Sequence, residues 1–254
     1  MEPRPALSAV LITYNTAEQL APCLASLKFA DEILVVDAGS TDATLEIAHS
    51  FGARTIHHAW PGFGPQKRFA VEQARHDWVL CIDADERVPA ELAREIRSEL
   101  TAPQYRAYEM SRANFFMGRY LRHGEGFPDW SLRLFHRAHA QWSMDAVHEK
   151  VVCDGVVGRM NRKYSLLHHS APSLAAYLDK QNRYTTLQAQ ALFAAGQKAG
   201  AMRLVISPAL RFFKFYLLRA GFLDGMPGLV HITLGCFNSF MKYAKLSVLW
   251  REQP

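Results

Sequence analysis

The sequence predicts an α/β protein, built on a mostly parallel sheet with helices on both of its faces. The first third of the chain alternates short, continuously apolar segments with segments whose apolar residues recur at helical spacing. Strands of a sheet that is covered on both faces are expected to be apolar throughout. The composition, with 49% hydrophobic and 21% charged residues, is that of a folded protein with a sizeable core.

Four strands and four helices are expected before residue 102. The expected strands cover residues 8–14, 32–37, 54–56 and 78–83. The expected helices cover residues 17–27, a short stretch ending near 51, 66–75 and 89–100. Ligands of open parallel sheets bind at the carboxyl ends of the strands. Asp37 and Asp83 both stand at such ends, which makes that edge of the sheet the first candidate site.

The pattern changes after residue 102. Residues 103–170 are rich in aromatic residues and Arg, with short strands expected near 107–110, 131–136 and 150–152. A long helix is expected over residues 173–195, and the segment that follows is both apolar and basic. We therefore expect one α/β domain over residues 1–200 and a helical tail over residues 201–254.

The net charge of +5 belongs to the tail, because residues 201–254 hold seven Lys and Arg against two acidic residues. A basic, apolar segment favours an anionic membrane surface as a partner. Four cations interrupt the tail before it reaches the length of a membrane span, namely Arg203, Arg211, Lys214 and Arg219. On a helical wheel these cations occupy an arc of about 160°, which suits a helix lying in the membrane interface. The alternative is a helical hairpin that packs on the body of the protein or on a dimer partner.

Composition also bears on the other partners and on the compartment. Nucleic acid is not expected, since the chain has no basic groove with interleaved aromatic residues and no known binding motif. The cysteines are widely spaced, which argues against a zinc ribbon or a disulfide scaffold and favours a reducing compartment. Cys81 lies in an apolar strand and is expected to be a buried thiol. Residues 1–8 lack the apolar core of a signal peptide, so we expect a cytoplasmic protein.

The strongest candidate for chemistry is Asp83-Ala84-Asp85, which follows the fourth expected strand. Two carboxylates near one point suit a hard divalent ion, which prefers oxygen ligands. Such an ion neutralises a nucleotide diphosphate and stabilises it as a leaving group when a glycosidic bond breaks. The alternative is that one of the acids caps the helix expected from Pro89.

Asp37 is the second candidate. Its carboxylate is suited to accept a hydrogen bond from the ring N–H of uracil or from a ribose hydroxyl. The alternative is turn chemistry, because Asp-x-Gly-Ser is a favourable turn on its own. A second acid at the same edge of the sheet, Asp83, favours the nucleotide interpretation.

Two strings of the sequence together resemble glycosyltransferase family 2. They are Val-Val-Asp-Ala-Gly-Ser-Thr-Asp-Ala-Thr at residues 35–44 and Ile-Asp-Ala-Asp-Glu at residues 82–86, and the end of the first strand, Thr13-Tyr14-Asn15, matches as well. More narrowly, the chain resembles the lipopolysaccharide core β-1,4-glucosyltransferase subgroup. That resemblance rests on residues 62–67, 147–149, 169–174, 180, 183–184 and 222–225. It spans nearly the whole chain.

The resemblance implies a GT-A fold, a UDP-sugar donor, Mg²⁺ or Mn²⁺ as cofactor, and inversion at the anomeric carbon. It implies that Asp37 contacts the uracil, that Asp83 lies by the ribose or the metal, and that Asp85 binds the metal. The base pocket is then lined by Thr13, Tyr14 and Asn15. Lys67 is expected near the nucleotide or its diphosphate, since a lysine close to a helix N-terminus suits that group. The alternative for Lys67 is an ordinary solvated side chain.

An inverting transfer needs a base that takes the proton of the acceptor hydroxyl. Glu149, within Val147-His148-Glu149, is the first candidate, and Asp129 is the second. The alternative for Glu149 is a surface salt bridge with Lys150 or a nearby Arg. His148 is a candidate third metal ligand or a residue that orients the base, and a packed, hydrogen-bonded histidine is the alternative.

Trp130 and Arg133 are candidates for holding the acceptor or a donor phosphate, because Arg binds phosphates through two parallel hydrogen bonds. His168 and His169 are expected to have structural roles. Neighbouring residues of a strand point to opposite faces and rarely bind one ion together.

The function expected from residues and resemblance is that of a cytoplasmic, membrane-peripheral, inverting glycosyltransferase. Its expected reaction moves glucose from UDP-glucose to a lipid-linked saccharide, such as the inner-core heptose of lipopolysaccharide. Another UDP-sugar or acceptor is one alternative. A nucleotidyltransferase is disfavoured, because residues 13–18 lack a glycine-rich phosphate loop. A non-catalytic carbohydrate- or membrane-binding scaffold is disfavoured by the Asp83–Asp85 pair and Glu149.

Overall fold

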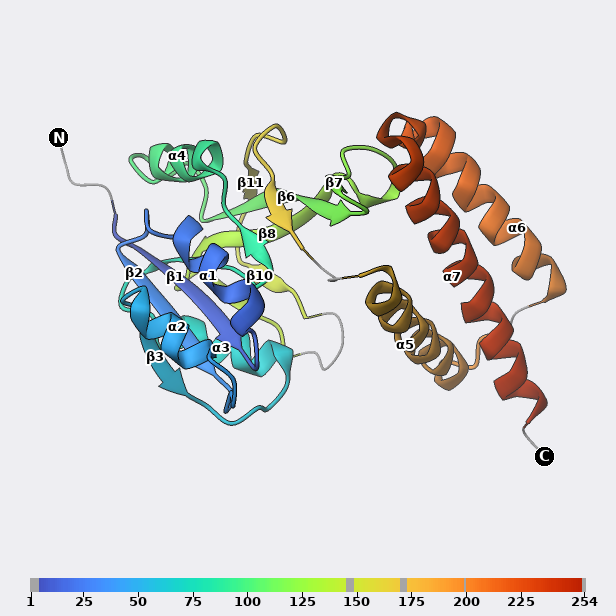
Figure 1. The fold of residues 1–254 in the computed structure, drawn as a ribbon, viewed down its shortest axis with the longest axis horizontal. Coiled ribbons are helices and arrows are strands. Elements are labelled where there is room, and N and C mark those ends of the chain that lie inside the picture. The colour runs from blue at the N-terminus through green and yellow to red at the C-terminus, as the bar shows by residue number, and fades with distance from the viewer. Residues whose placement is uncertain (1–4, 145–148, 170–172, 199, 253–254) are drawn as a thin grey trace. The chain divides into compact units, whose positions relative to one another are not determined.

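Figure 1 shows a computed structural model of the chain, which describes residues 5–144, 149–169, 173–198 and 200–252. The chain forms two compact units. The first contains residues 1–112 and 129–168, and the second contains residues 113–128 and 169–254. The second unit is larger than the expected tail, because it also contains residues 113–128, a hairpin from the middle of the chain, and residues 169–200. The domain boundary expected at residue 200 stays a prediction.

Four parallel strands form one half of the large sheet, in the spatial order β3-β2-β1-β4. Their bounds are β1 (Leu7–Thr13), β2 (Glu32–Asp37), β3 (Arg54–His57) and β4 (Trp78–Cys81). The register places Thr13 beside Asp37, and β4 ends two residues before Asp83. The carboxyl ends of β1, β2 and β4 therefore meet at one edge of the sheet, as the sequence predicts.

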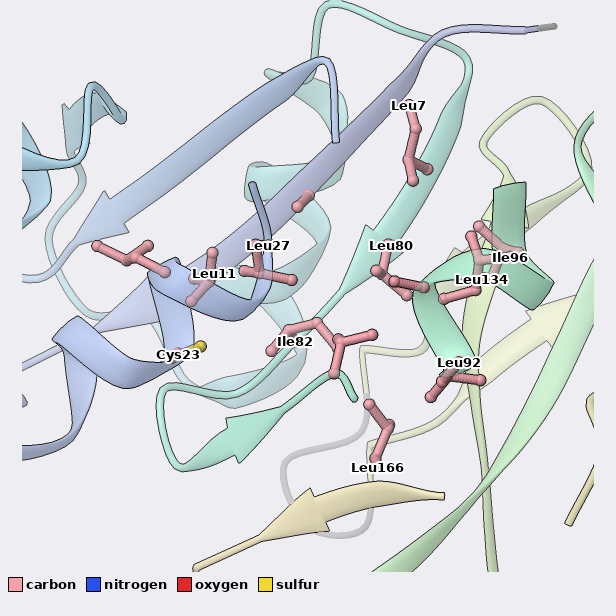
Figure 2. Close-up of a cluster of buried hydrophobic side chains, with 14 of the residues drawn as sticks. Leu7, Leu11, Cys23, Leu27, Leu80, Ile82, Leu92, Ile96, Leu134 and Leu166 are labelled. Atoms are coloured by element: carbon pink, nitrogen blue, oxygen red, sulfur yellow. The ribbon is translucent and has the colours of Figure 1, made fainter. Parts of the chain in front are cut away.

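Helices cover both faces of this half. They are α1 (Ala17–Ser26), α2 (Thr44–Ser50), α3 (Phe63–Glu72) and α4 (Ala90–Glu99). Side chains of β1 alternate between the faces, since Leu11 packs in one buried cluster and Val10 in another. Figure 2 shows the first cluster, which contains Leu11, Cys23 of α1 and Leu92 of α4. The second cluster contains residues of α3, so the strands are buried from either side.

The helix expected over residues 66–75 begins and ends three residues earlier, as α3. Gly62 precedes it with a φ of 118°, a conformation that strongly favours glycine. Pro65 lies in the first turn, where its missing N–H breaks no helical hydrogen bond. The proline therefore belongs to the helix, which the expected boundary did not allow for.

Further strands complete the sheet, most of them antiparallel to their neighbours, although β11 is parallel to β6. β8 (Asp129–His136) pairs with β4, and β6 (Ala107–Phe116) pairs with β8. Shorter strands extend these or pair with each other, namely β5 (Glu86–Arg87), β7 (Arg119–Tyr120), β9 (Ala140–Trp142), β10 (Val151–Cys153), β11 (Val157–Arg159) and β12 (Leu166–His168). The sequence predicts β6, β8 and β10. The other short strands, of two or three residues each, show no period that marks them in the sequence.

The second unit is mainly helical. Its helices are α5 (Leu174–Ala194), α6 (Ala201–Phe212) and α7 (Gly225–Arg251), with a π-helical turn η2 (Phe213–Leu218) and 3₁₀ turns η1 (Gly124–Gly126) and η3 (Gly221–Asp224). Both α5 and α6 pack against α7. The hydroxyl of Ser173 caps α5 by accepting a hydrogen bond from the N–H of Ala176. Across the described ranges, no helix is both long enough and apolar enough to cross a membrane.

Candidate active site

Asp37 ends β2 in a tight turn. One carboxylate oxygen accepts hydrogen bonds from the hydroxyls of Thr13 (2.8 Å) and Ser40 (2.5 Å), and the other accepts from the N–H groups of Gly39 (2.8 Å) and Ser40 (2.7 Å). Burial raises the pKa of Asp37, but these four hydrogen bonds outweigh it and lower that pKa below its ordinary value. Asp37 therefore forms the turn that its sequence context favours. The contact of Asp37 with a nucleotide base stays a prediction.

The loop after β1 lies against this turn. The side-chain oxygen of Asn15 accepts a hydrogen bond from the N–H of Thr41 (2.8 Å), and the N–H of Asn15 donates to the hydroxyl of Ser40 (2.8 Å). Asn15 has a φ of 51°, in the left-handed region that Asn tolerates better than most residues. Tyr14 is 59% exposed. Thr13, Tyr14, Asn15 and Asp37 are thus brought together, with an aromatic face open to solvent.

Asp83 lies beyond β4 and binds two cations. One carboxylate oxygen lies 3.2 Å from the Lys67 amino group, and the other accepts a hydrogen bond from Arg133 at 2.7 Å. Burial raises the pKa of Asp83, but the charges of Arg133 and Lys67 outweigh it and hold that pKa well below its usual range. The side chain of Asp83 is 30% exposed, so its carboxylate is partly accessible to solvent. It is an ionised carboxylate at the edge of the sheet.

Lys67 joins Asp83 to Glu149. Its amino group lies 3.2 Å from a carboxylate oxygen of Glu149 and 4.6 Å from the ring centre of Trp142. The Lys67 side chain is only 11% exposed, so the alternative of a solvated lysine is wrong. The ion pair expected as the alternative for Glu149 does form, but with Lys67 rather than with Lys150 or an Arg. Both residues therefore belong to the site.

A buried carboxylate that the sequence did not single out connects the remaining residues. Glu86 is fully buried, and one of its oxygens accepts from Arg133 at 2.7 Å and from Arg112 at 3.3 Å. Its other oxygen accepts from the N–H of Asp83 at 3.0 Å. Arg112 in turn donates two hydrogen bonds to Asp129, at 2.6 and 2.9 Å. The candidate base Asp129 is thereby linked to Asp83 through alternating charges.

Arg133 is the deepest cation of the site. Its side chain is 3% exposed and reaches both Asp83 and Glu86. Burial lowers its pKa, but the two carboxylates outweigh this and raise it, so the guanidinium stays charged. Its Nε is buried and has no hydrogen-bond partner among the residues that the structure describes. Trp130, predicted alongside it, lies under the Arg159 guanidinium, which is 5.0 Å from the ring centre. The contact of Trp130 and Arg133 with an acceptor or a phosphate stays a prediction.

The second acid of the pair, Asp85, lies 3.3 Å from the Nε2 of His168 and is 30% exposed. Within the described residues, no group of three His, Cys, Asp or Glu side chains is arranged to hold a metal ion. Mg²⁺ usually takes one or two carboxylates and completes its shell with substrate phosphates and water. Asp85 and the ionised Asp83 fit that donor set. The predicted ligand His148 lies outside the described residues.

The two neighbouring histidines have different partners, as their alternation predicts. His168 contacts Asp85, whereas His169 bonds to the Tyr120 hydroxyl at 2.7 Å and stacks on Phe115. The cysteines are free thiols, and burial raises the pKa of Cys81 to about 12. The expectation of a buried thiol at Cys81 is confirmed.

Comparison with known proteins identifies the family. Residues 8–169 match the model of glycosyl transferase family 2. The chain belongs to glycosyltransferase family 2. It is 31% identical to the lipopolysaccharide core biosynthesis glycosyltransferase LpsC of Rhizobium meliloti, over 97% of this chain and 93% of LpsC. It is 32% identical to an uncharacterized glycosyltransferase of Rickettsia bellii, over 96% of this chain and 86% of that protein.

Solved structures of other transferases share the fold. The mannosyltransferase PcManGT of Pyrobaculum calidifontis, solved with GDP-Man and Mn²⁺, has a TM-score of 0.58 at 16% identity and covers 99% of this chain and 89% of its own. The S. aureus TarS 1–349 structure has a TM-score of 0.51 at 16% identity and covers 98% and 92%. These likenesses confirm the predicted GT-A fold. The family match and the relative LpsC confirm the assignment of this chain to the glycosyltransferases.

Proposed function

We propose that this chain is an inverting glycosyltransferase that moves glucose from UDP-glucose to a lipid-linked saccharide, such as the inner-core heptose of lipopolysaccharide. The observation that carries the proposal is the cluster of Asp83, Lys67 and Arg133 at the carboxyl end of β4, in a family 2 fold. The acceptor class is supported by a relative that matches over nearly its whole length and is described as a lipopolysaccharide core glycosyltransferase.

The donor nucleotide is proposed to bind across the ends of β1 and β2. The exposed Tyr14 ring offers a face on which a base can stack, and Asp37 is an ionised hydrogen-bond acceptor at the same edge. Lys67 and Arg133 are proposed to hold the diphosphate, because both are charged donors next to that edge. Their bonds to Asp83 and Glu149 keep these cations in place before the donor arrives.

A divalent ion, Mg²⁺ or Mn²⁺, is proposed to be held by Asp85 and Asp83. When bound, the ion neutralises charge on the leaving diphosphate. Asp85 is the better protein ligand of the two, since Asp83 already pairs with Lys67 and Arg133. The chain's cations and the ion then act on the same leaving group.

Glu149 is proposed as the base that takes the acceptor proton, and Asp129 is the alternative. A base must stay ionised and must lie on the side of the sugar opposite the departing UDP. One observation favours Asp129: it is fixed by Arg112, whereas Glu149 shares Lys67 with the donor-side Asp83. Variants of both residues, described below, decide between them.

We further propose that the enzyme works at the cytoplasmic face of the inner membrane as a peripheral protein. The acceptor carries a lipid, and the basic, apolar segment over residues 201–254 suits an anionic surface.

Product analysis tests the reaction. The protein is incubated with UDP-glucose, Mn²⁺ and a heptose-terminated lipopolysaccharide core from which the next sugar is missing. We expect UDP release that depends on the acceptor, and a new β-linked glucose in the product. GDP-mannose and UDP-GlcNAc are the competing donors. Faster transfer from either would replace the donor, and no transfer from any donor would favour the non-catalytic scaffold.

A further inference from the structure

Charge is divided unevenly between the two compact units. Residues 113–128 and 169–254 hold twelve Lys and Arg against four Asp and Glu, a net charge of +8. The remainder holds 17 against 20, a net charge of −3. Two of the four acids in the second unit are already neutralised, because Asp224 is buried among donors and Glu125 pairs with Arg211. The second unit therefore presents a basic surface.

An apolar stripe runs along one side of α6 and continues onto η2. Its members are spaced three or four residues apart with one adjacent pair, so they share one helical face: Met202, Val205, Ile206, Leu210, Phe213 and Leu217. Their exposed fractions run from 45% to 71%. Among them Val205 and Leu210 are exposed to 71% and 63%. We call these six residues the apolar stripe.

The opposite side of α6 is occupied. The hydroxyl of Ser207 lies 2.8 Å from that of Ser239 on α7, and Arg211 pairs with Glu125. Arg211 was expected to share one arc of an interfacial helix with three other cations, but its guanidinium is held by Glu125. Since α7 and Glu125 take this side, the apolar stripe is the side that faces outward.

A basic cluster lies at the η2 end of the stripe. Asp224, fully buried in η3, accepts hydrogen bonds from the N–H groups of Arg122 (2.9 Å) and His123 (2.8 Å). The Arg119 guanidinium donates to the Asp224 carbonyl at 3.2 Å. These bonds tie the hairpin to η3, whose Phe222 and Leu223 are exposed. We call the exposed cations here, Arg119, Arg122, Lys214 and Arg219, the basic end.

We propose that α6 and η2 lie flat on a bilayer that contains anionic lipids, with the apolar stripe inserted and the basic end against the headgroups. The inference rests on the proposed function in one respect, because a lipid-linked acceptor requires the enzyme to meet a membrane. An amphipathic helix with flanking cations binds such a surface through buried apolar area and electrostatic attraction. The proposed docking surface also includes Arg119 and Arg122 of the hairpin, which lies far from the tail in the sequence.

A second copy of the chain fits this surface less well. A symmetric dimer buries the same patch on both partners, and would bring two units of net charge +8 together. Anionic headgroups instead complement that charge. The electrostatic part of the attraction weakens with salt, whereas the apolar part does not.

Vesicle flotation of the full chain tests the proposal. Vesicles of phosphatidylcholine with and without phosphatidylglycerol are compared for wild type, Val205→Gln/Leu210→Gln, and Arg119→Gln/Arg122→Gln. Gln is a good helix former, so the first pair keeps α6 intact. The control is Leu187→Gln/Val248→Gln, which changes one exposed hydrophobic residue of α5 (50%) and one of α7 (49%).

We expect the stripe pair to lower binding to anionic vesicles by about tenfold or more, and the control pair to change it less than about twofold. The arginine pair should bring the affinity for anionic vesicles closer to that for neutral ones and reduce the effect of salt. Equal binding by wild type and the stripe pair would overturn the proposal. So would light scattering that shows a wild-type dimer dissociated by the stripe pair.

The same variants separate this proposal from the proposed function. Sugar transfer to a water-soluble acceptor is measured without detergent or vesicles. The transfer rate of the stripe pair should match that of wild type. If no protein transfers sugar to any acceptor, the proposed function fails while the flotation result still decides the docking. If transfer is normal and flotation shows no difference, the docking surface fails alone.

Discussion

The first compact unit buries most of its apolar side chains, whereas the second leaves many of them exposed. Of the 43 buried hydrophobic residues in the described part of the chain, seven lie in the second unit. Of the 25 large hydrophobic residues that are exposed there, 18 lie in the second unit. A packed sheet can hold charged side chains in a fixed geometry. A helical unit with an exposed apolar side is suited to binding a membrane surface. The difference supports the proposal that the first unit carries the chemistry and the second the membrane-docking surface.

The largest expected effect is on the chemistry of the first unit. Asp85→Asn keeps the size of the side chain and removes the charge proposed to hold the metal. We expect transfer to fall by about a hundredfold or more, with an unchanged circular dichroism spectrum and unchanged vesicle flotation. Near-normal transfer that still needs metal would move the ligand role to another residue.

The base is tested by a pair of variants. Glu149→Gln keeps a hydrogen-bonding side chain for Lys67 but cannot take a proton, so kcat should fall by about a hundredfold with donor affinity almost unchanged. Asp129→Asn is the matched control, because that carboxylate is also held by a cation. Asp129 would be the base instead of Glu149 if Asp129→Asn abolished turnover with donor binding intact while Glu149→Gln did not.

Glu86 tests whether the buried charges of the first unit position the site. Glu86→Gln leaves Arg133 and Arg112 without their shared anion, and unfolding free energy should drop by about 3 kcal/mol. Turnover should fall as well, because Glu86 links Arg112, which holds Asp129, to Arg133, which holds Asp83. Urea titration and transfer assays are run on the same samples.

Glu32→Gln is the control for that variant. Glu32 is also buried, and it accepts from Ser8 and pairs with Arg54, but it begins β2 rather than ending a strand. It should lose stability with turnover nearly intact. Equal losses of turnover in both variants would mean that Glu86 acts through stability alone.

A smaller effect is expected in the second unit. Burial lowers the pKa of His231 on α7 to about 4, aided by the charge of Arg211. The unfolded chain binds this proton near pH 6.5, so it takes up more protons than the folded chain between pH 6.5 and pH 4. Stability is therefore lost as pH falls through that window, by about 1–2 kcal/mol at pH 5.

Urea titrations at pH 7 and pH 5 measure this loss, with His231→Gln as the comparison. The variant carries no titrating ring, so its loss between the two pH values should be smaller than that of wild type. An equal loss in both proteins would place the pH dependence on other groups.

Much of the fold and part of the site follow from local patterns. Continuous apolar runs locate β1, β2 and β4, and the two acids at strand ends, Asp37 and Asp83, mark the edge where the site lies. The hydrogen bonds of Asp37 to Gly39 and Ser40 are local and belong to a familiar turn. Such features need only neighbours in sequence.

The charge network could not be predicted in the same way. Arg133 meets Glu86 because β8 runs antiparallel beside β4, a pairing that no local pattern specifies. Arg112 reaches Asp129 because β6 pairs with β8 in a register that places the two residues opposite each other. The sequence alone does not distinguish a charged residue that is buried in an ion pair from one that is exposed to solvent. The one available signal was Glu86, which follows the Asp83–Asp85 pair directly.

Calorimetric titration of the full chain with UDP, GDP and ADP, each with Mn²⁺ and with EDTA, tests the central claim most directly. We propose that uridine binds at Asp37 and that a metal-bound diphosphate binds at Lys67, Arg133 and Asp85. This proposal predicts that UDP binds with Mn²⁺, at least about tenfold more tightly than GDP or ADP, and that EDTA abolishes this binding. Tight binding of GDP, or UDP binding that is indifferent to EDTA, would contradict it.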